Sequence, residues 1–194
     1  MRPLKPVITG LAEPTDPDWP PDHELLARAA GCRADEVKLV GYGPPVSPHL
    51  AAQLSGRPLD AAELRAGIRA AQTDGEVLIV EGVGGLLVPI SDGYDVRCLA
   101  RDLGLPLLVA ARPGLGTLNH TLLTLEAARA VGLRVLGVVL TPWPRTPSRV
   151  ERSNLETLER LGGVPASTLP EIARAEPRLL AAAGEALPLG RWIE

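Results

Sequence analysis

The central part of the chain alternates short apolar runs with helical patterns, and this alternation limits the folds open to it. Continuous runs rich in Val, Leu and Ile occupy residues 77–80, 106–110 and 135–140. Such runs are typical of strands buried on both faces of a sheet. Strands that alternate with helices form crossover units in a mostly parallel sheet. We therefore expect an α/β fold with a doubly wound parallel sheet flanked by helices.

Helix start and stop signals bound the segments around these runs. Asp, Ser and Asn are common just before a first helical turn, and Gly is common just after the last. These signals predict helices over residues 22–31, 47–55, 60–73, 95–103, 119–131 and 148–161, and a short strand over 164–168. No internal repeat or second domain is visible, so we expect residues 1–194 to form a single domain. Its core must be mainly aliphatic, because the chain has no Phe.

Composition argues against several classes of protein. The chain is 45% hydrophobic and 22% charged with a net charge of -3, which is typical of a globular protein. It lacks both a basic stripe for nucleic acid and an apolar run of about 18 residues for a membrane span. Cys32 and Cys98 form no CxxC pair, so we expect free thiols in the reducing cytoplasm. The three histidines show no metal-ligand spacing, so zinc is not expected.

The residues that follow predicted strands are candidates for chemistry, because ligands bind at the carboxyl ends of strands in such sheets. Glu81-Gly-Val-Gly-Gly85 follows the first run, and a carboxylate on a rigid strand end suits nucleotide-bound Mg²⁺. The alternative is a strand-ending turn in which Glu81 caps the next segment. Lys5 lies beside a short apolar stretch and could clamp phosphate oxygens, and Asp22 could be a second metal ligand. The alternatives are a solvated lysine and a helix-capping aspartate.

A third candidate is the glycine-rich segment from Arg112 to His120, which leads into a predicted helix. Backbone N–H groups at a helix N-terminus suit a carboxylate or a phosphate. The alternative is that Thr117 or Asn119 merely caps the helix.

Together these segments resemble the dethiobiotin synthetase family. The matching stretches follow the family's order and cover nearly the whole chain: Lys5–Gly10, Asp22 with Leu25 and Leu26, Ser47-Pro48-His49, Glu81–Pro89, Gly114–Thr124 and Asn154–Leu158. The resemblance implies a P-loop NTPase-like fold and a homodimer with the substrate site at its interface. It implies a ligase of biotin biosynthesis that closes 7,8-diaminononanoate (7,8-diaminopelargonate) and CO₂ into dethiobiotin. ATP and Mg²⁺ are required, and the intermediates are a carbamate and a carbamic phosphate.

The resemblance also assigns roles to residues. Lys5 matches the catalytic lysine, and Asp22 and Glu81 match the Mg²⁺ ligands. The substrate-binding positions are Thr9, Val83, Gly84, Gly116, Thr117, Leu118, Asn119 and Asn154. The nucleotide-binding positions are Asp22, Glu81, Gly82, Val83, Gly84, Thr141, Pro142, Leu169, Pro170 and Glu171.

Two features depart from the family pattern. The family places a strand, a GxxxxxGK[ST] phosphate loop and a helix before the Lys-Pro-Val segment, which here begins at residue 5, and no Gly-Lys dipeptide occurs in the chain. We therefore expect a truncated chain that lacks the first strand–P-loop–helix unit, exposes apolar sheet and helix faces, and turns over negligibly by itself. Thr141 stands where the family often has an amide, so the preference for ATP over other nucleoside triphosphates stays open.

Two alternative functions also stay open. A non-catalytic binding or regulatory module could have kept the diamine carboxylate site and lost ATP use. Loss of the phosphate loop favours this alternative, while retention of Lys5, Asp22 and Glu81 opposes it. The other alternative is a different P-loop amidoligase or a partition-type ATPase, which the Lys-Pro-Val segment and residues 116–120 oppose.

Overall fold

The computed structural model describes residues 1–193 and divides into two compact units, residues 1–103 and residues 104–194. Each unit combines parallel strands with helices and has its own hydrophobic cluster. The expected α/β architecture is therefore present in both, while the expectation of a single domain stays a prediction. Within the described residues, no helix is long and apolar enough to cross a membrane.

The first unit contains three pairs of short strands. Its elements are β1 (Arg2–Leu4), β2 (Val7–Ile8), α1 (Asp22–Ala30), the 3₁₀ helix η1 (Ala34–Glu36), β3 (Val40–Gly41), α2 (Pro48–Leu54), α3 (Ala61–Ala70), β4 (Leu78–Val80), β5 (Pro89–Ser91), β6 (Tyr94–Asp95) and α4 (Val96–Leu103). Strand β1 pairs in parallel with β4, and β2 pairs in parallel with β3. Strands β5 and β6 form a small antiparallel hairpin.

The core of the first unit is aliphatic, as the absence of Phe predicts. Leu4 of β1, Val7 of β2, Ile68 of α3 and Ile90 of β5 are almost fully buried in one cluster. Tyr42 joins them, and its hydroxyl donates to the carbonyl of Arg57 at 3.1 Å. The burial of this polar group is therefore compensated by a hydrogen bond.

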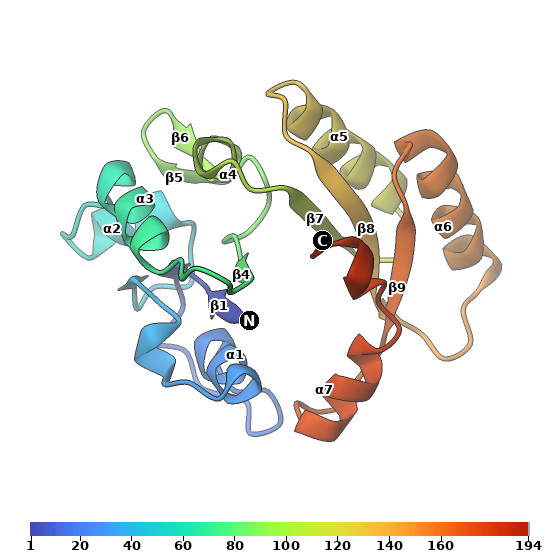
Figure 1. Ribbon diagram of the computed structural model, residues 1–194, viewed down its shortest axis with the longest axis horizontal. Coiled ribbons are helices and arrows are strands. Elements are labelled where there is room, and N and C mark those ends of the chain that lie inside the picture. The colour runs from blue at the N-terminus through green and yellow to red at the C-terminus, as the bar shows by residue number, and fades with distance from the viewer. Residues whose placement is uncertain (194) are drawn as a thin grey trace. The chain divides into compact units, whose positions relative to one another are not determined.

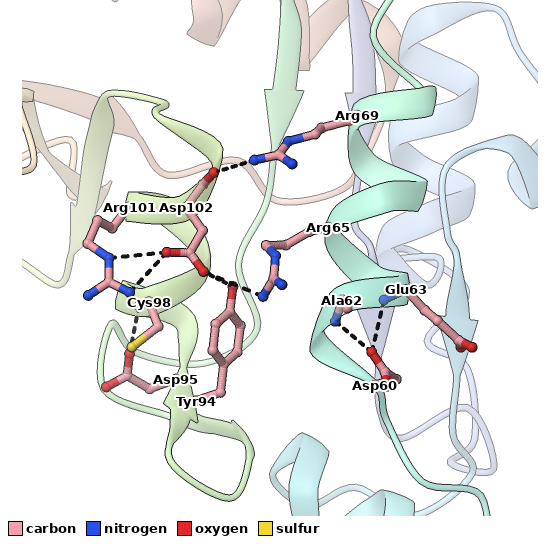
Figure 2. A network of polar contacts seen from close by, with 10 residues as sticks. All are labelled: Asp60, Ala62, Glu63, Arg65, Arg69, Tyr94, Asp95, Cys98, Arg101 and Asp102. Carbon is pink, nitrogen blue, oxygen red and sulfur yellow. Dashed lines mark hydrogen bonds and ion pairs between the residues drawn. The ribbon is translucent and has the colours of Figure 1, made fainter.

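A polar network ties helix α3 to helix α4 and strand β6 (Figure 2). The Tyr94 hydroxyl donates to the Asp102 carboxylate at 3.0 Å, and the Arg65 guanidinium lies 3.4 Å from the same carboxylate. Arg65 also lies over the Tyr94 ring, 5.4 Å from its centroid. Arg69 donates to the backbone carbonyl of Asp102 at 2.8 Å. These contacts fix the segment that follows the Gly82–Gly85 loop.

The second unit is built on a three-stranded parallel sheet. Its elements are β7 (Leu107–Ala111), α5 (Thr117–Arg129), β8 (Val135–Trp143), α6 (Arg149–Gly162), β9 (Ala166–Pro170), α7 (Pro177–Gly184) and the 3₁₀ helix η2 (Leu189–Arg191). Strand β8 lies between β7 and β9, and helices α5 and α6 run along this sheet (Figure 1). Leu125, Val138, Leu140 and Leu158 form the buried core.

Burial of the strands differs from the sequence expectation at two places. Ile79 in β4 is 50% exposed and Leu108 in β7 is 43% exposed, so these two strands are not buried on both faces. Among the described residues, β4 pairs only with β1, and β7 pairs only with β8. A strand with one neighbour is covered less completely than a central strand. The expectation of exposed apolar side chains on the sheet is thereby confirmed.

The capping predictions divide into those that hold and those that fail. Asp60 caps α3 by accepting from the N–H groups of Ala62 and Glu63 at 2.6 and 3.0 Å. Ser47 stands before α2, but its hydroxyl pairs with Nδ1 of His49 at 3.0 Å and does not cap the helix. Asp22 begins α1 without capping it, because its carboxylate pairs with Lys5.

Candidate active site

Lys5 lies between β1 and β2, and its side chain is buried against two carboxylates. The residue is 8% exposed, and its backbone N–H donates to the carbonyl of Val37 at 2.7 Å. Its Nζ donates to Asp22 and, at 2.7 Å, to Glu81. The structure therefore brings together the three charged residues that the sequence singles out, from positions up to 76 residues apart.

The register of β1 against β4 explains why Lys5 and Glu81 meet. Leu4 is opposite Val80 in the parallel pair, so Lys5 and Glu81 both leave the same edge of the sheet. The N–H of Glu81 donates to the carbonyl of Leu4 at 2.8 Å, which extends the ladder by one bond. Asp22 reaches the cluster from the first turn of α1, a helix that packs beside β1.

The two carboxylates keep Lys5 in its charged form. Burial lowers the pKa of Lys5, but the hydrogen bonds that its ammonium donates to Asp22 and Glu81, together with their negative charge, outweigh this effect, and the pKa lies above its usual 10.5. The ammonium group is therefore protonated at physiological pH. A fixed, partly desolvated cation of this kind stabilises negative charge that develops on a bound substrate.

The carboxylates of Asp22 and Glu81 also fit a divalent cation. Both reach one common nitrogen, so a single cation can contact both, and about half of each side chain is exposed. Mg²⁺ is bound by one or two carboxylates together with phosphate oxygens and water, rather than by a full cage of side chains. No group of three or more metal-binding side chains occurs within residues 1–193.

The loop Gly82–Gly85 leaves the end of β4 beside these carboxylates. Gly84 has a φ of +69°, and a Cβ there would lie 2.9 Å from Cγ2 of Val88. Only glycine fits this position without strain. Val83 packs against the core of the first unit, while Gly82 and Gly84 are exposed. The loop therefore offers accessible backbone next to the charged cluster.

Two further residues of the first unit lie close in sequence to the charged cluster. Thr9 directly follows β2 and is half-buried, and no hydrogen bond joins its side chain to the cluster in the described part of the chain. His23, next to Asp22, is 7% exposed, and its Nδ1 is buried without a hydrogen-bond partner. Burial and the charge of Lys38 lower the pKa of His23. No motif in the sequence distinguishes His23.

The second unit holds the predicted substrate-carboxylate segment. Gly116 precedes α5 with a φ of +92°, and Thr117 is buried while Gly116 and Asn119 are exposed. Among the described residues no side chain caps this helix, so neither Thr117 nor Asn119 serves as a simple cap. The N–H of Thr117 donates to the carbonyl of Gly114 at 3.3 Å, whereas no backbone acceptor within residues 1–193 meets the N–H groups of Leu118 and Asn119. These two N–H groups can bind an anion.

The side chain of Asn154 contacts the backbone of the loop that precedes α5. The residue lies on α6, is 7% exposed, and its Nδ2 donates to the carbonyls of Pro113 and Gly114 at 2.9 and 3.2 Å. It thereby holds the loop that leads to the predicted positions Gly116 to Asn119, and its own predicted role in substrate binding stays a prediction. No sequence pattern indicates these carbonyl partners.

The predicted base-side residues come together at the ends of two neighbouring strands. Thr141 and Pro142 lie in the last part of β8, Leu169 and Pro170 end β9, and Glu171 directly follows β9. Trp143 is opposite Pro170, and the N–H of Glu171 donates to the carbonyl of Trp143 at 2.9 Å. The structure thus places these five residues together, all within the second unit.

Comparison with known proteins identifies the family of the chain. A family model described as an AAA domain matches residues 2–175. The ATP-dependent dethiobiotin synthetase BioD of Rhodococcus jostii (strain RHA1) is 41% identical over 162 residues, which cover 82% of this chain and 68% of the relative. That of Saccharopolyspora erythraea is 40% identical over 195 residues (97% and 85%), and that of Aquifex aeolicus is 36% identical over 173 (89% and 76%). By these matches the chain belongs to the dethiobiotin synthetase family, ligases of biotin biosynthesis with a P-loop NTPase-like fold.

Proposed function

We propose that this chain carries the ring-closing chemistry of its family: 7,8-diaminononanoate, CO₂ and ATP give dethiobiotin, ADP and phosphate. The observation that carries this proposal is the buried Lys5, held between Asp22 and Glu81 at the end of two paired strands. A protonated amine beside two carboxylates is suited to phosphoryl transfer, in which positioning and charge stabilisation supply most of the catalysis.

The proposed reaction has three steps. One amine of the substrate adds to CO₂, supplied by bicarbonate, and loses a proton to give a carbamate. A carbamate oxygen then takes the terminal phosphoryl group of ATP, which releases ADP and leaves a carbamic phosphate. The second amine attacks the carbonyl carbon, the bond from that carbon to the phosphate oxygen breaks, and the cyclic urea closes with release of phosphate and a proton.

Lys5 has the central role in this proposal. Its ammonium neutralises the carbamate and then the charge on the transferring phosphoryl group, and its burial keeps water from screening that interaction. Asp22 and Glu81 hold the ammonium in place and would also hold Mg²⁺ together with the nucleotide phosphates. When bound, Mg²⁺ withdraws charge from the phosphate oxygens. Backbone of Val83 and Gly84 and the hydroxyl of Thr9 would line the diamine.

The second unit supplies the remaining binding groups. Backbone from Gly116 to Asn119 would hold the distal carboxylate of the substrate at the N-terminus of α5, across the interface of a homodimer. Thr141, Pro142, Leu169, Pro170 and Glu171 would face the nucleotide base, and the single hydroxyl of Thr141 gives weak discrimination between bases. The free thiols of Cys32 and Cys98 fit a reducing cytoplasm.

The 194 residues contain no GxxxxxGK[ST] sequence. Because that loop cradles nucleotide phosphates and supplies a further Mg²⁺-binding hydroxyl, we propose that this chain alone turns over negligibly. The test is to measure dethiobiotin formation with the diamine, bicarbonate, ATP and Mg²⁺. One sample is the chain itself, and the other is a longer protein that includes any GxxxxxGK[ST] sequence encoded in frame upstream.

Dethiobiotin from the longer protein, lost when any one substrate is omitted, supports the proposal. An absence of product from a folded, phosphate-loop-containing protein contradicts it and favours the non-catalytic binding module. Robust product from the 194-residue chain would overturn the inference about the phosphate loop.

A further inference from the structure

The loop before α5 has a buried base and an exposed tip. Pro113 and Thr117 are buried, while the side chain of Leu115 is 99% exposed. Gly116 adopts a φ of +92°, and in the described residues no side chain caps the helix. Such a loop needs support from elsewhere to keep one conformation, because glycine is flexible and the usual capping bond is missing.

Asn154 of α6 provides this support. An asparagine amide has two N–H donors, and those of Asn154 meet the carbonyls of Pro113 and Gly114 at 2.9 and 3.2 Å. The carbonyl of Gly114 also accepts from the N–H of Thr117 at 3.3 Å. One backbone oxygen therefore joins the side chain of Asn154 to the first residue of α5.

Helix α6 is itself fixed along its length, so Asn154 has a rigid base. Ser148 and Glu151 form a reciprocal capping box at its start. Leu158 is fully buried one turn after Asn154, and Arg129 of α5 donates to the carbonyl of Gly162 at its end. The amide of Asn154 consequently meets the loop from a helix with little freedom to move.

We propose that Asn154 is a positioning residue, which sets the backbone of residues 113–117 so that the N–H groups of Leu118 and Asn119, in the first turn of α5, face a bound carboxylate. It acts through the loop and makes no contact with the ligand itself. The assignment of the carboxylate to this loop rests on the proposed function, whereas the hold on the loop rests on the contacts of Asn154 alone.

The first experiment measures hydrogen exchange at the backbone amides of residues 114–118. Asn154→Asp keeps the shape of the side chain but places a carboxylate against two carbonyl oxygens. Asn154→Leu removes the two N–H donors of the amide without adding a charge. Glu156→Gln, at an exposed position of the same helix, is the control. We expect exchange in the loop to accelerate about 10-fold or more in both Asn154 variants, since buried carbonyls lose their donors, with β8 and the control unchanged. Unchanged exchange in the loop of either folded variant overturns the proposal.

The second experiment separates positioning from general damage. Calorimetry compares 7,8-diaminononanoate with octane-2,3-diamine, which has the same diamine end and lacks the carboxylate. We expect the Asn154→Leu variant to lose about 10-fold in affinity for the carboxylate ligand and nothing for the other, because one misplaced charged hydrogen bond has this magnitude. An equal loss for both ligands shows a merely structural role and overturns the positioning proposal.

The two experiments fail in different ways. If the loop loosens while the affinity for the carboxylate ligand is unchanged, Asn154 holds the loop but the carboxylate site of the proposed function is wrong. In that case Asn154 is not a positioning residue for this ligand. If the loop does not loosen, the inference about Asn154 is wrong whatever the protein binds.

Discussion

The two compact units differ in the polar contacts that each contains. Among residues 1–193, the ion pairs lie in the first unit, with Arg174–Glu176 as the exception. In the second unit, Asn154, Arg129 and Arg152 instead donate to backbone carbonyls. The first unit also has such contacts, from Tyr42 and Arg69, so the difference between the units lies in the number of side-chain ion pairs.

The largest expected effect tests the charge side of this comparison. In an active, phosphate-loop-containing form, Lys5→Met should lower kcat by about 10²–10³-fold, the usual loss when one stabilising donor is removed. Lys38→Met is the matched control, because Lys38 is the only other lysine. Steady-state assays of dethiobiotin formation give the result. Equal activity of the two variants would show that the buried lysine has no catalytic role.

Truncating an apolar side chain in the core of the second unit should lower stability strongly, and by the same amount at every pH. Leu158 is fully buried, so Leu158→Ala should lower the free energy of unfolding by about 2–5 kcal/mol. Leu161→Ala, on the same helix at a 54% exposed position, should cost far less. Urea unfolding followed by fluorotryptophan NMR resolves Trp143 and Trp192 of the second unit from Trp19 of the first, and the penalty should be equal at about pH 5 and about pH 8. A loss of stability that depends on pH would show that charged groups also contribute to the core of the second unit, and would contradict the prediction.

A third prediction compares two residues that look alike in sequence. Asp60 caps α3 through two backbone N–H groups, so Asp60→Ala should cost about 1 kcal/mol of stability. Ser47→Ala should cost markedly less, because Ser47 precedes α2 without capping it. Thermal unfolding of both variants measures this difference. Equal losses would mean that Ser47 does cap its helix in solution.

The smallest expected effect is on the stability of the first unit at acidic pH. The guanidinium of Arg101 hydrogen-bonds Asp102 and, with help from Tyr94, holds the pKa of that carboxyl below its usual 3.8. Its contribution to stability is present above pH 3.8 and is lost as pH falls through the lower folded pKa. Asp102→Asn should therefore flatten the acid limb of a plot of Tm against pH.

Asp74→Asn, at an exposed position between α3 and β4, is the control for this acid effect. Curves for Asp102→Asn and wild type that stay parallel from neutral to acidic pH would contradict the prediction. They would indicate that the network of Figure 2 adds little to the first unit.

Much of the architecture is predictable because long apolar runs and strong caps are local signals. The strands around residues 77–80, 106–110 and 135–140 appear within a few residues of their expected bounds. Short elements such as β3 and β6 are not predictable, because two residues carry no period and depend on a partner strand distant in sequence. The exposure of Ile79 also depends on which neighbours a strand has.

The candidate site follows the same rule. Glu81 is predictable as a candidate because it directly follows an apolar run. Lys5 and Asp22 are candidates for binding the same phosphates and metal as Glu81, and in the structure Lys5 contacts both carboxylates. The roles themselves come from the family resemblance and stay predictions. The hold of Asn154 on two carbonyls is not predictable, because backbone acceptors are present at every residue and only the fold selects among them.

The parallel register of β1 against β4 has a consequence for how such a chain tolerates insertions and deletions. Leu4 opposite Val80 fixes the meeting of Lys5 with Glu81, so one residue added within either strand would turn one of these side chains to the opposite face. The exposed loop between residues 11 and 19 lies outside the strands, and its length contributes only a slowly varying closure entropy. Length variation should therefore be accepted in that loop and rejected in two three-residue strands.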